Sequence, residues 1–323
     1  MTTFKEIRGT AIQVVSSDPS NPELGQIWYN SSSGTLKGYK SVNTWSAGGN
    51  LNTARTSMAG MGIQTAALGA GGETTVYVGT TESYNGTSWT TVNSLNTSRA
   101  GSGTGTQTAA LVFGGFRGPP VPTGTLTATE SWTGTSWTSV NSLNTARVGG
   151  GRAGTQTAAL TMGGQVVAPG ALLANTESWN GTSWTSVNSM NTARTNVGCG
   201  IQTAAITAGG NTGPAFTGAT ELWNGTSWTN NPTGLNTVRS GVCMGGTQTA
   251  ALGFGGNIPP LSAATELWNG STWTSNPTGL GTARVGGGDG TQTSAIIFGG
   301  ELPGMTAATE EWTGLSTQTI TVS

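Results

Sequence analysis

The charged residues that recur in register along the chain are one set of arginines and one set of glutamates. The arginines are Arg55, Arg99, Arg147, Arg194, Arg239 and Arg284, and the glutamates are Glu82, Glu130, Glu177, Glu221, Glu266 and Glu310. A ring of arginines could bind sulfated or acidic sugars, because guanidinium groups bind such anions through paired hydrogen bonds. Alternatively, each arginine pairs with a glutamate of its own or the neighbouring repeat. Equal numbers favour this structural interpretation, since a buried charge without a partner is costly.

The composition is unfavourable for catalysis. The chain of 323 residues contains no histidine, which removes the usual general base and the commonest metal ligand. The acidic residues occur mostly once per repeat, so their spacing indicates no carboxylate pair for glycoside hydrolysis. Glu310 and Glu311 are adjacent and would point to opposite faces of a strand. We therefore expect a protein that is not an enzyme and that has no cofactor and no metal site.

Charge also limits the partners. Only 8% of residues are charged, the net charge is -1, and 12 Lys and Arg are spread over the chain. A nucleic-acid binder needs clustered basic residues, so we expect no nucleic-acid partner. The first 20 residues contain Lys5, Glu6 and Arg8 and no long apolar run. This pattern predicts neither a secretory signal nor a transmembrane helix, and we expect synthesis in a cytoplasm without membrane insertion.

The arginines and glutamates belong to a repeated unit that covers most of the chain from residue 50 onward. Each copy has an NTAR-like motif, a QTAA-like block, a double glycine such as Gly163-Gly164, a variable stretch, and then two aromatics five residues apart, such as Trp179 and Trp184. Gly, Asn and Thr turns divide the unit into four short segments, which we name strands a, b, c and d. Units of about 40 to 50 residues with four antiparallel strands are typical of β-propeller blades.

At the double glycine and the spaced aromatics, exemplified by Gly163-Gly164, Trp179 and Trp184, the chain resembles the kelch-repeat family over about residues 45 to 315. The resemblance implies an all-β, six-bladed kelch-like β-propeller. Kelch propellers serve many functions, so the resemblance concerns the fold.

The last unit has Trp312 but no second tryptophan, whereas Trp45 is a strand-d tryptophan with no complete unit before it. We expect the strand near Trp45 to complete the sixth blade and close the ring. Alternatively, the C-terminal TQTITVS fills that place, and the N-terminal segments form a partial seventh blade or a separate docking hairpin.

The N-terminal region differs from the repeats. Residues 1–24 lack periodicity and contain the turn-rich SSDPSNPEL, which predicts a short arm or attachment segment. From residue 25, GQIWYNSSSGTLKGYK alternates around SSSG and predicts a hairpin. We thus divide the chain into an arm (1–24) and a propeller (25–323). The chain also resembles tail-fibre and other virion structural proteins of marine bacteriophages. The features that carry this resemblance are the segment GQIWYNSSSGTLKGYK, the near-identical Gly/Thr/Ser/Asn-rich repeats and the ITVS ending. That resemblance implies a virion location and other virion or tail proteins as partners.

The recurring aromatics and the two cysteines also have alternative roles. Paired aromatics such as Trp132 and Trp137 could stack on sugars, but their regular positions favour packing between blades. Cys199 and Cys243 occupy successive repeats. They could form a disulfide, although two buried thiols are favoured without a secretory signal.

Function on a rigid scaffold usually resides in variable loops. The six connections between strands b and c should surround one mouth of the channel: Glu73 to Thr80, Phe116 to Thr129, Gln165 to Thr176, Asn211 to Thr220, Asn257 to Ala264 and Glu301 to Ala308. The candidate binding residues on or beside them are Tyr77, Phe116, Arg117, Leu172, Leu173, Phe216, Ile258 and Leu261. A contiguous apolar rim would mark an interaction surface. Alternatively, prolines such as Pro259 and Pro260 only stiffen these loops.

Three functional hypotheses follow. The first is a non-catalytic virion component, a phage tail-fibre or tail-tip propeller, docked by its arm and contacting the host surface or neighbouring subunits through its loops. A host glycan or protein would then be the receptor. The second is a bacterial kelch-like sugar-binding module, and the third is a glycan-cleaving enzyme.

Overall fold

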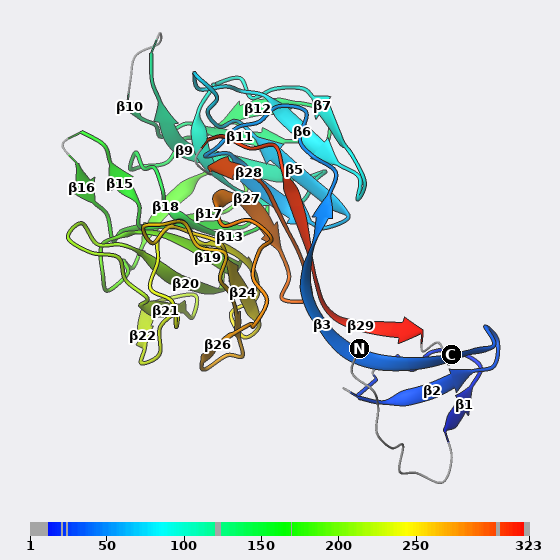
Figure 1. Ribbon diagram of the computed structural model, residues 1–323. Coiled ribbons are helices and arrows are strands. Elements are labelled where there is room, and N and C mark those ends of the chain that lie inside the picture. Colours follow the sequence, from blue (N-terminus) through cyan, green and yellow to red (C-terminus); the bar gives the residue numbers. More distant parts are fainter. Residues whose placement is uncertain are drawn as a thin grey trace. The chain divides into compact units, whose positions relative to one another are not determined.

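The computed structural model describes residues 12–20, 22–23, 25–119, 124–168, 170–301 and 304–319, without the side chains of residues 40, 41 and 315–319. All its regular elements are β-strands (Figure 1). Among the described residues, none lies in a helix long and apolar enough to cross a membrane. The chain forms two compact units, residues 45–312 and residues 1–44 together with 313–323. The functional division expected from the sequence, with an attachment arm over residues 1–24, stays a prediction.

In the described part of residues 45–312, six sheets repeat one pattern of four antiparallel strands, so the expected six-bladed all-β propeller is confirmed. Blade 1 contains β4 (Ala59–Ile63), β5 (Ala66–Ala70), β6 (Thr81–Tyr84) and β7 (Trp89–Val92). Blade 2 contains β8 (Ala100–Gly105), β9 (Ala110–Arg117), β11 (Thr129–Trp132) and β12 (Trp137–Val140), with the short β10 (Gly124–Thr125) paired to β9. Blade 3 contains β13 (Gly151–Gly154), β14 (Ala159–Met162), β17 (Thr176–Trp179) and β18 (Trp184–Val187).

The remaining blades continue the pattern. The pair β15 (Gln165–Val166) and β16 (Ala171–Leu172) lies in the connection of blade 3. Blade 4 contains β19 (Thr195–Ile201), β20 (Ala204–Asn211), β21 (Thr220–Trp223) and β22 (Trp228–Asn231). Blade 5 contains β23 (Cys243–Gly246), β24 (Ala251–Phe254), β25 (Thr265–Trp268) and β26 (Trp273–Ser275). Blade 6 contains β27 (Val285–Gly290), β28 (Ser294–Glu301) and β29 (Thr309–Thr319), and the sheet order continues to β3 (Thr35–Gly48).

Glycine lets the innermost strands turn and approach one another. Gly62, the last residue but one of β4, has a φ of +96°, and a Cβ there would lie 2.3 Å from the Ala66 carbonyl oxygen. A Cβ on Gly60 would lie 2.4 Å from the Gly288 nitrogen of blade 6. A larger residue at Gly60 would therefore push adjacent blades apart, and one at Gly62 would collide with the next strand of its own blade.

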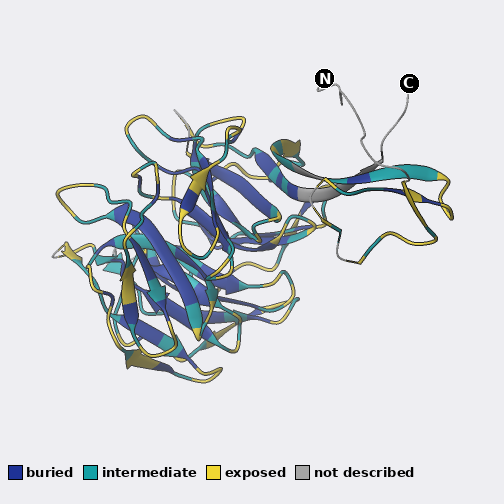
Figure 2. Cartoon of the chain, turned by 90° about the horizontal axis from the view of Figure 1, so that it is seen from below, coloured by how far each residue is buried: buried dark blue, intermediate teal, exposed yellow. Residues whose placement is uncertain are grey.

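Burial follows the blades: the dark blue segments in Figure 2 are mostly strands, whereas the connections are mostly yellow or teal. The paired aromatics lie in the core, as expected: Trp132 and Trp137 pack with Met61, Leu68 and Val112 of blades 1 and 2. Each strand-d tryptophan donates its indole N–H to a strand-c threonine hydroxyl of the preceding blade, at 2.9–3.1 Å. The pairs are Trp89 with Thr309, Trp137 with Thr81, Trp184 with Thr129, Trp228 with Thr176, Trp273 with Thr220 and Trp45 with Thr265.

Trp45 occupies the strand-d position of blade 6. Its indole N–H lies 2.9 Å from the Thr265 hydroxyl, and its ring centroid lies 4.9 Å from that of Phe254 and 5.5 Å from that of Trp312. On the other side of blade 6, Trp89 and Gln64 of blade 1 bond to Thr309 and Glu311. Residues 317–319 continue β29 itself, so neither the C-terminal strand nor a seventh blade is needed to complete the ring.

The smaller unit contains the predicted hairpin. The strand β2 (Ile27–Asn30) pairs antiparallel with β3 around Ser31–Gly34, and β1 (Gln13–Val15) pairs parallel with β2. The Asp18 carboxylate accepts hydrogen bonds from Lys37 at 2.7 Å, Asn30 at 2.7 Å and Trp28 at 3.0 Å. These bonds favour the ionised form and lower the pKa of Asp18 to about 2.

Replacing Trp45 tests how the ring closes. Trp45→Ala removes the Thr265 hydrogen bond and the ring contacts of a half-buried side chain, and we expect it to lower the free energy of unfolding by about 2 kcal/mol. The measurement is guanidinium chloride denaturation followed by circular dichroism. The control is Tyr29→Ala in the smaller unit, expected to change stability by less than about 0.5 kcal/mol because Tyr29 is exposed. Equal stability of Trp45→Ala and the wild type would contradict this closure.

Candidate functional site

The connections between strands b and c form small hairpins on one common plan. The residue after each double glycine pairs with a residue where the chain returns. The pairs are Glu73 with Tyr77, Phe116 with Thr125, Gln165 with Leu172, Asn211 with Phe216, Asn257 with Leu261 and Glu301 with Met305. Four of the candidate residues, Tyr77, Leu172, Phe216 and Leu261, therefore occupy the same return position in different blades. The large apolar side chains selected from the sequence are thus a regular part of hairpin structure.

All eight candidate side chains are half-buried. The more exposed apolar side chains of these connections are Val76 at 47%, Val167 at 43% and Met305 at 43%. Leu173 has a backbone role, because its N–H donates to the Gly164 carbonyl and its carbonyl accepts from the Arg194 N–H. Arg117 pairs with Gly124 in the blade 2 hairpin. Of this set, Tyr77 and Phe116 line one cavity together.

That cavity, which we name the aromatic pocket, has a volume of about 380 Å³ and is formed by blades 1, 2 and 3. Its walls include Glu73 and Tyr77 of blade 1, Phe116 of blade 2, and Gln165 and Val167 of blade 3. Residues at or just before the starts of the innermost strands also line it, including Ser57, Ser102 and Gly149. The b-to-c connections and the strand-a starts therefore lie on the same face around this cavity.

Two aromatic side chains from adjacent blades meet in the pocket. The ring centroids of Tyr77 and Phe116 lie 5.6 Å apart with planes at 69°. Gly118 packs against Tyr77, since a Cβ there would lie 2.9 Å from the Tyr77 ring. Burial, and secondarily the Glu73 carboxylate, raise the pKa of Tyr77. The phenol thus stays neutral beside a carboxylate at neutral pH.

Small residues at the start of the blade 2 inner strand leave room for the pocket. Ala100, Gly101 and Ser102 line it, and the Ser102 hydroxyl donates to the Gly150 carbonyl at 2.9 Å. In blade 4 the corresponding residues are Thr195, Asn196 and Val197. The Asn196 side chain there bonds to the Gly151 N–H and the Thr207 hydroxyl. Gly101 has no side chain at the position of Asn196, and a Cβ there would lie 3.3 Å from the Val112 side chain.

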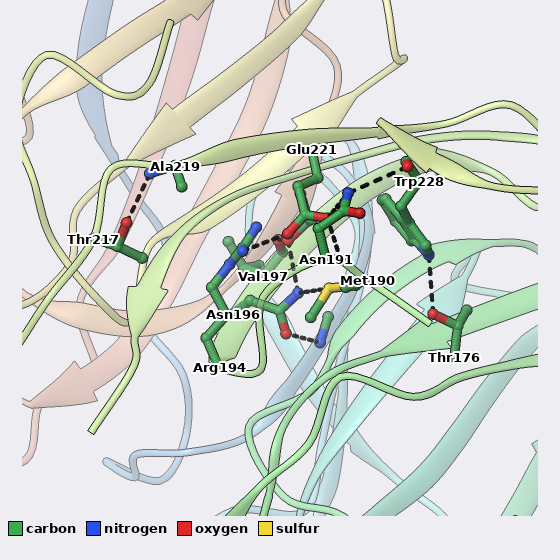
Figure 3. Close-up of polar contacts among 12 residues, drawn as sticks. Thr176, Met190, Asn191, Arg194, Asn196, Val197, Thr217, Ala219, Glu221 and Trp228 are labelled. Atoms are coloured by element: carbon green, nitrogen blue, oxygen red, sulfur yellow. Dashed lines mark hydrogen bonds and ion pairs between the residues drawn. The ribbon is translucent and has the colours of Figure 1, made fainter. Parts of the chain in front are cut away.

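The repeated arginines and glutamates are engaged inside the blades. Each arginine forms an ion pair with the glutamate of its own blade, and the arginine side chains are at most 2% exposed. In blade 4 the Arg194 guanidinium lies 2.6 Å from Glu221, whose other oxygen accepts from the Asn191 N–H at 2.7 Å (Figure 3). These guanidinium groups do not face solvent, so they offer no surface for acidic sugars.

A second cavity of about 190 Å³ lies in the channel, where the glycines that end the inner strands converge. Arg152 of blade 3 donates to the carbonyls of Gly60 in blade 1 at 3.0 Å and Gly288 in blade 6 at 2.6 Å. Asp289 lines the same cavity. Burial raises the pKa of Asp289 to about 6, although Arg152 acts in the opposite direction. We interpret Arg152 as a structural link across the channel.

The two cysteines are free and buried. Burial raises the pKa of Cys199 and raises that of Cys243 to about 11. Both thiols therefore stay protonated at neutral pH. Because both cysteines are free, the disulfide alternative is wrong. In the described part of the chain, no cluster of three or more acidic or cysteine side chains could hold a metal.

Sequence reasoning found Tyr77 and Phe116 but missed Glu73, Gln165 and Val167. Glu73 and Gln165 could have been found from their position in the repeat, because they directly follow double glycines, as Phe116 does. The sequence did not show that Tyr77 and Phe116 would meet, because they lie in hairpins of different length.

No family model matches the chain, and no curated protein matches its sequence. Among solved structures, the one described as "Structure of YjhT" is similar, with a TM-score of 0.68 and 13% sequence identity over 83% of this chain and 99% of that chain. Likeness at this identity concerns the fold, and it confirms the kelch-like propeller.

The ion pairs can be tested with a double substitution in blade 3. Arg147→Met leaves the buried Glu177 carboxylate without its cation, and we expect a loss of about 3 kcal/mol in the free energy of unfolding. Adding Glu177→Leu removes the uncompensated charge and should recover part of the loss. Recovery is incomplete because the N–H groups of Asn144 and Thr145 lose their acceptor. Denaturant unfolding measures both variants, and a double variant less stable than Arg147→Met would contradict the expectation.

The raised pKa of Asp289 predicts a pH dependence. A carboxyl whose pKa is higher in the folded state stabilises the fold below its unfolded pKa near 4, and this contribution is lost as pH rises through about 6. Asp289→Asn should therefore raise the thermal midpoint at pH 7 and flatten its change between pH 4 and 6. Asp18→Asn is the control. Because the pKa of Asp18 is lowered in the folded state, its protonation changes the stability below pH 4 and not between pH 4 and 6. An unchanged pH profile in Asp289→Asn would refute this assignment.

Proposed function

We propose that this protein is a non-catalytic structural and adhesion component of a virion, a phage tail-fibre or tail-tip propeller. Its arm, residues 1–24, docks to other tail proteins, and its b-to-c face contacts a host surface glycan or protein, or a neighbouring subunit. The observation that carries the proposal is the convergence of three variable hairpins on the aromatic pocket. By contrast, the residues that repeat in every blade are engaged in building the ring.

The non-catalytic part of the proposal rests on the available side chains. The chain has no histidine. Glu73 is the only carboxylate among the described residues that line the aromatic pocket. Hydrolysis of a glycosidic bond by the usual routes requires two carboxyl groups across the substrate. This favours binding over the glycan-cleaving alternative, and incubation with host polysaccharide should release no reducing ends.

A bacterial sugar-binding module is the second candidate. The Tyr77 and Phe116 rings at the pocket favour it, since aromatic faces can stack on sugar rings. A glycan array separates the two candidates. Glycan binding that survives deletion of residues 1–24, in a protein missing from virions, would support the sugar-binding module.

Mass spectrometry of purified virions tests the proposal. We expect the protein to co-purify with particles through a density gradient, and we expect a chain lacking residues 1–24 to be lost from them. The Trp184→Ala variant is the control for folding, because it destabilises a blade and leaves the arm intact. Absence of the wild-type protein from purified particles would refute the virion role.

A further inference from the structure

The described lining of the aromatic pocket carries negative charge only. Among the described lining residues, the ionisable side chains are Glu73 and Tyr77, and none is Lys or Arg. The repeated arginines that precede lining residues, Arg55, Arg99 and Arg147, are buried and paired with the glutamates of their own blades. An anionic ligand would therefore meet an unfavourable potential here, whereas a cation would be attracted.

The two aromatic rings add to this potential. Tyr77 and Phe116 stand at 69° to each other and form a corner of the pocket wall. The face of an aromatic ring carries partial negative charge and attracts a cation within about 6 Å of the ring centroid. Glu73 lies beside Tyr77, so a carboxylate and two aromatic rings border one cavity.

The neighbouring backbone holds this corner in place. Gly118 packs directly against the Tyr77 ring, and the Glu73 backbone forms hydrogen bonds in both directions with Thr56, at 2.9 and 3.0 Å. The cavity of about 380 Å³ has space for a substituted ammonium group and part of the molecule that carries it. A rigid, partly formed site reduces the entropy lost on binding.

From these observations we propose that the aromatic pocket binds an organic ammonium group, enclosed by Tyr77 and Phe116 and paired with Glu73. The inference deepens the proposed function, because it names the chemistry that the b-to-c face would recognise. The group could be the amine of a lysine side chain or a quaternary ammonium headgroup. A neutral sugar is less suited to the pocket because the Ser102 hydroxyl is already donated to Gly150 and the one charge present favours a cation.

Binding of small probes to the purified full-length protein tests the proposal. The probes are choline, lysine methyl ester, 3,3-dimethylbutanol and methyl glucoside, titrated by calorimetry and by nuclear magnetic resonance to about 10 mM. Choline and 3,3-dimethylbutanol have nearly the same shape and differ in charge. We expect choline to bind at least about tenfold more tightly, since a cation gains from the carboxylate and both rings. The ratio of choline to lysine methyl ester affinity then separates a quaternary headgroup from a primary amine.

Substitutions assign the site. Glu73→Gln should weaken choline binding about tenfold, and Tyr77→Ala should abolish it. Glu301→Gln is the matched control, because Glu301 follows the double glycine of blade 6 as Glu73 does in blade 1, and its return residue is Met305 rather than an aromatic. It should leave binding unchanged. Thermal midpoints of all variants verify that they fold.

Three results would overturn the proposal. One is equal affinity for choline and 3,3-dimethylbutanol, which would indicate an apolar site. Another is preferential binding of methyl glucoside, which would indicate a sugar site. The third is no detectable cation binding by the folded wild type. Each result is independent of whether the protein is found in virions, so failure here is distinguishable from failure of the proposed function.

Discussion

The fold depends on burying the face of every blade against the next one around a closed ring. At each junction a strand-d indole bonds to a strand-c threonine of the preceding blade. At the junctions other than that of blades 6 and 1, a glutamine in the turn after strand a also bonds to a strand-c carbonyl, as Gln248 does to Trp223 at 2.6 Å. At the junction of blades 6 and 1, Gln64 instead bonds to the Glu311 carboxylate at 3.2 Å, and Tyr84 donates to the same carboxylate at 2.5 Å. Ring closure therefore uses side chains special to that junction, in addition to the repeated ones.

The residues that repeat in every blade are poor candidates for function, because they already bond to one another inside the ring. Arg194 and Glu221 form a buried ion pair inside one blade, and Glu221 also accepts a hydrogen bond from the Asn191 N–H. A ligand would have to displace these bonds and leave buried charges unpaired, which is costly. Specific recognition is thus left to residues that differ between blades, such as Glu73, Tyr77 and Phe116.

Much of the fold was predictable because it follows from sequence patterns that repeat within each blade. The double glycines, the aromatic spacing and the unmatched Trp45 predicted the blades, their number and the strand that completes the ring. The aromatic pocket was only partly predictable. Its lining combines three blades, and it includes Ala100, Gly101 and Ser102 where blade 4 has Thr195, Asn196 and Val197. Likewise, Arg152 gave no sequence signal of its contacts with Gly60 and Gly288, because those partners lie across the channel.

Two kinds of blade alternate around the ring. Gly62 follows Arg55 by seven positions and Gly105 follows Arg99 by six, and this alternation continues through Gly154, Gly200, Gly246 and Gly290. Blades 1, 3 and 5 accommodate the extra residue with a positive φ, at Ser57, Gly149 and Gly241, whereas blades 2, 4 and 6 have a register shift in the same place. The ring is thus built from three pairs of unlike blades. The aromatic pocket lies over blade 2 between two blades of the other kind. The repeat therefore positions the pocket, and Tyr77 and Phe116 give it the aromatic pair that distinguishes it from the corresponding places in other blades.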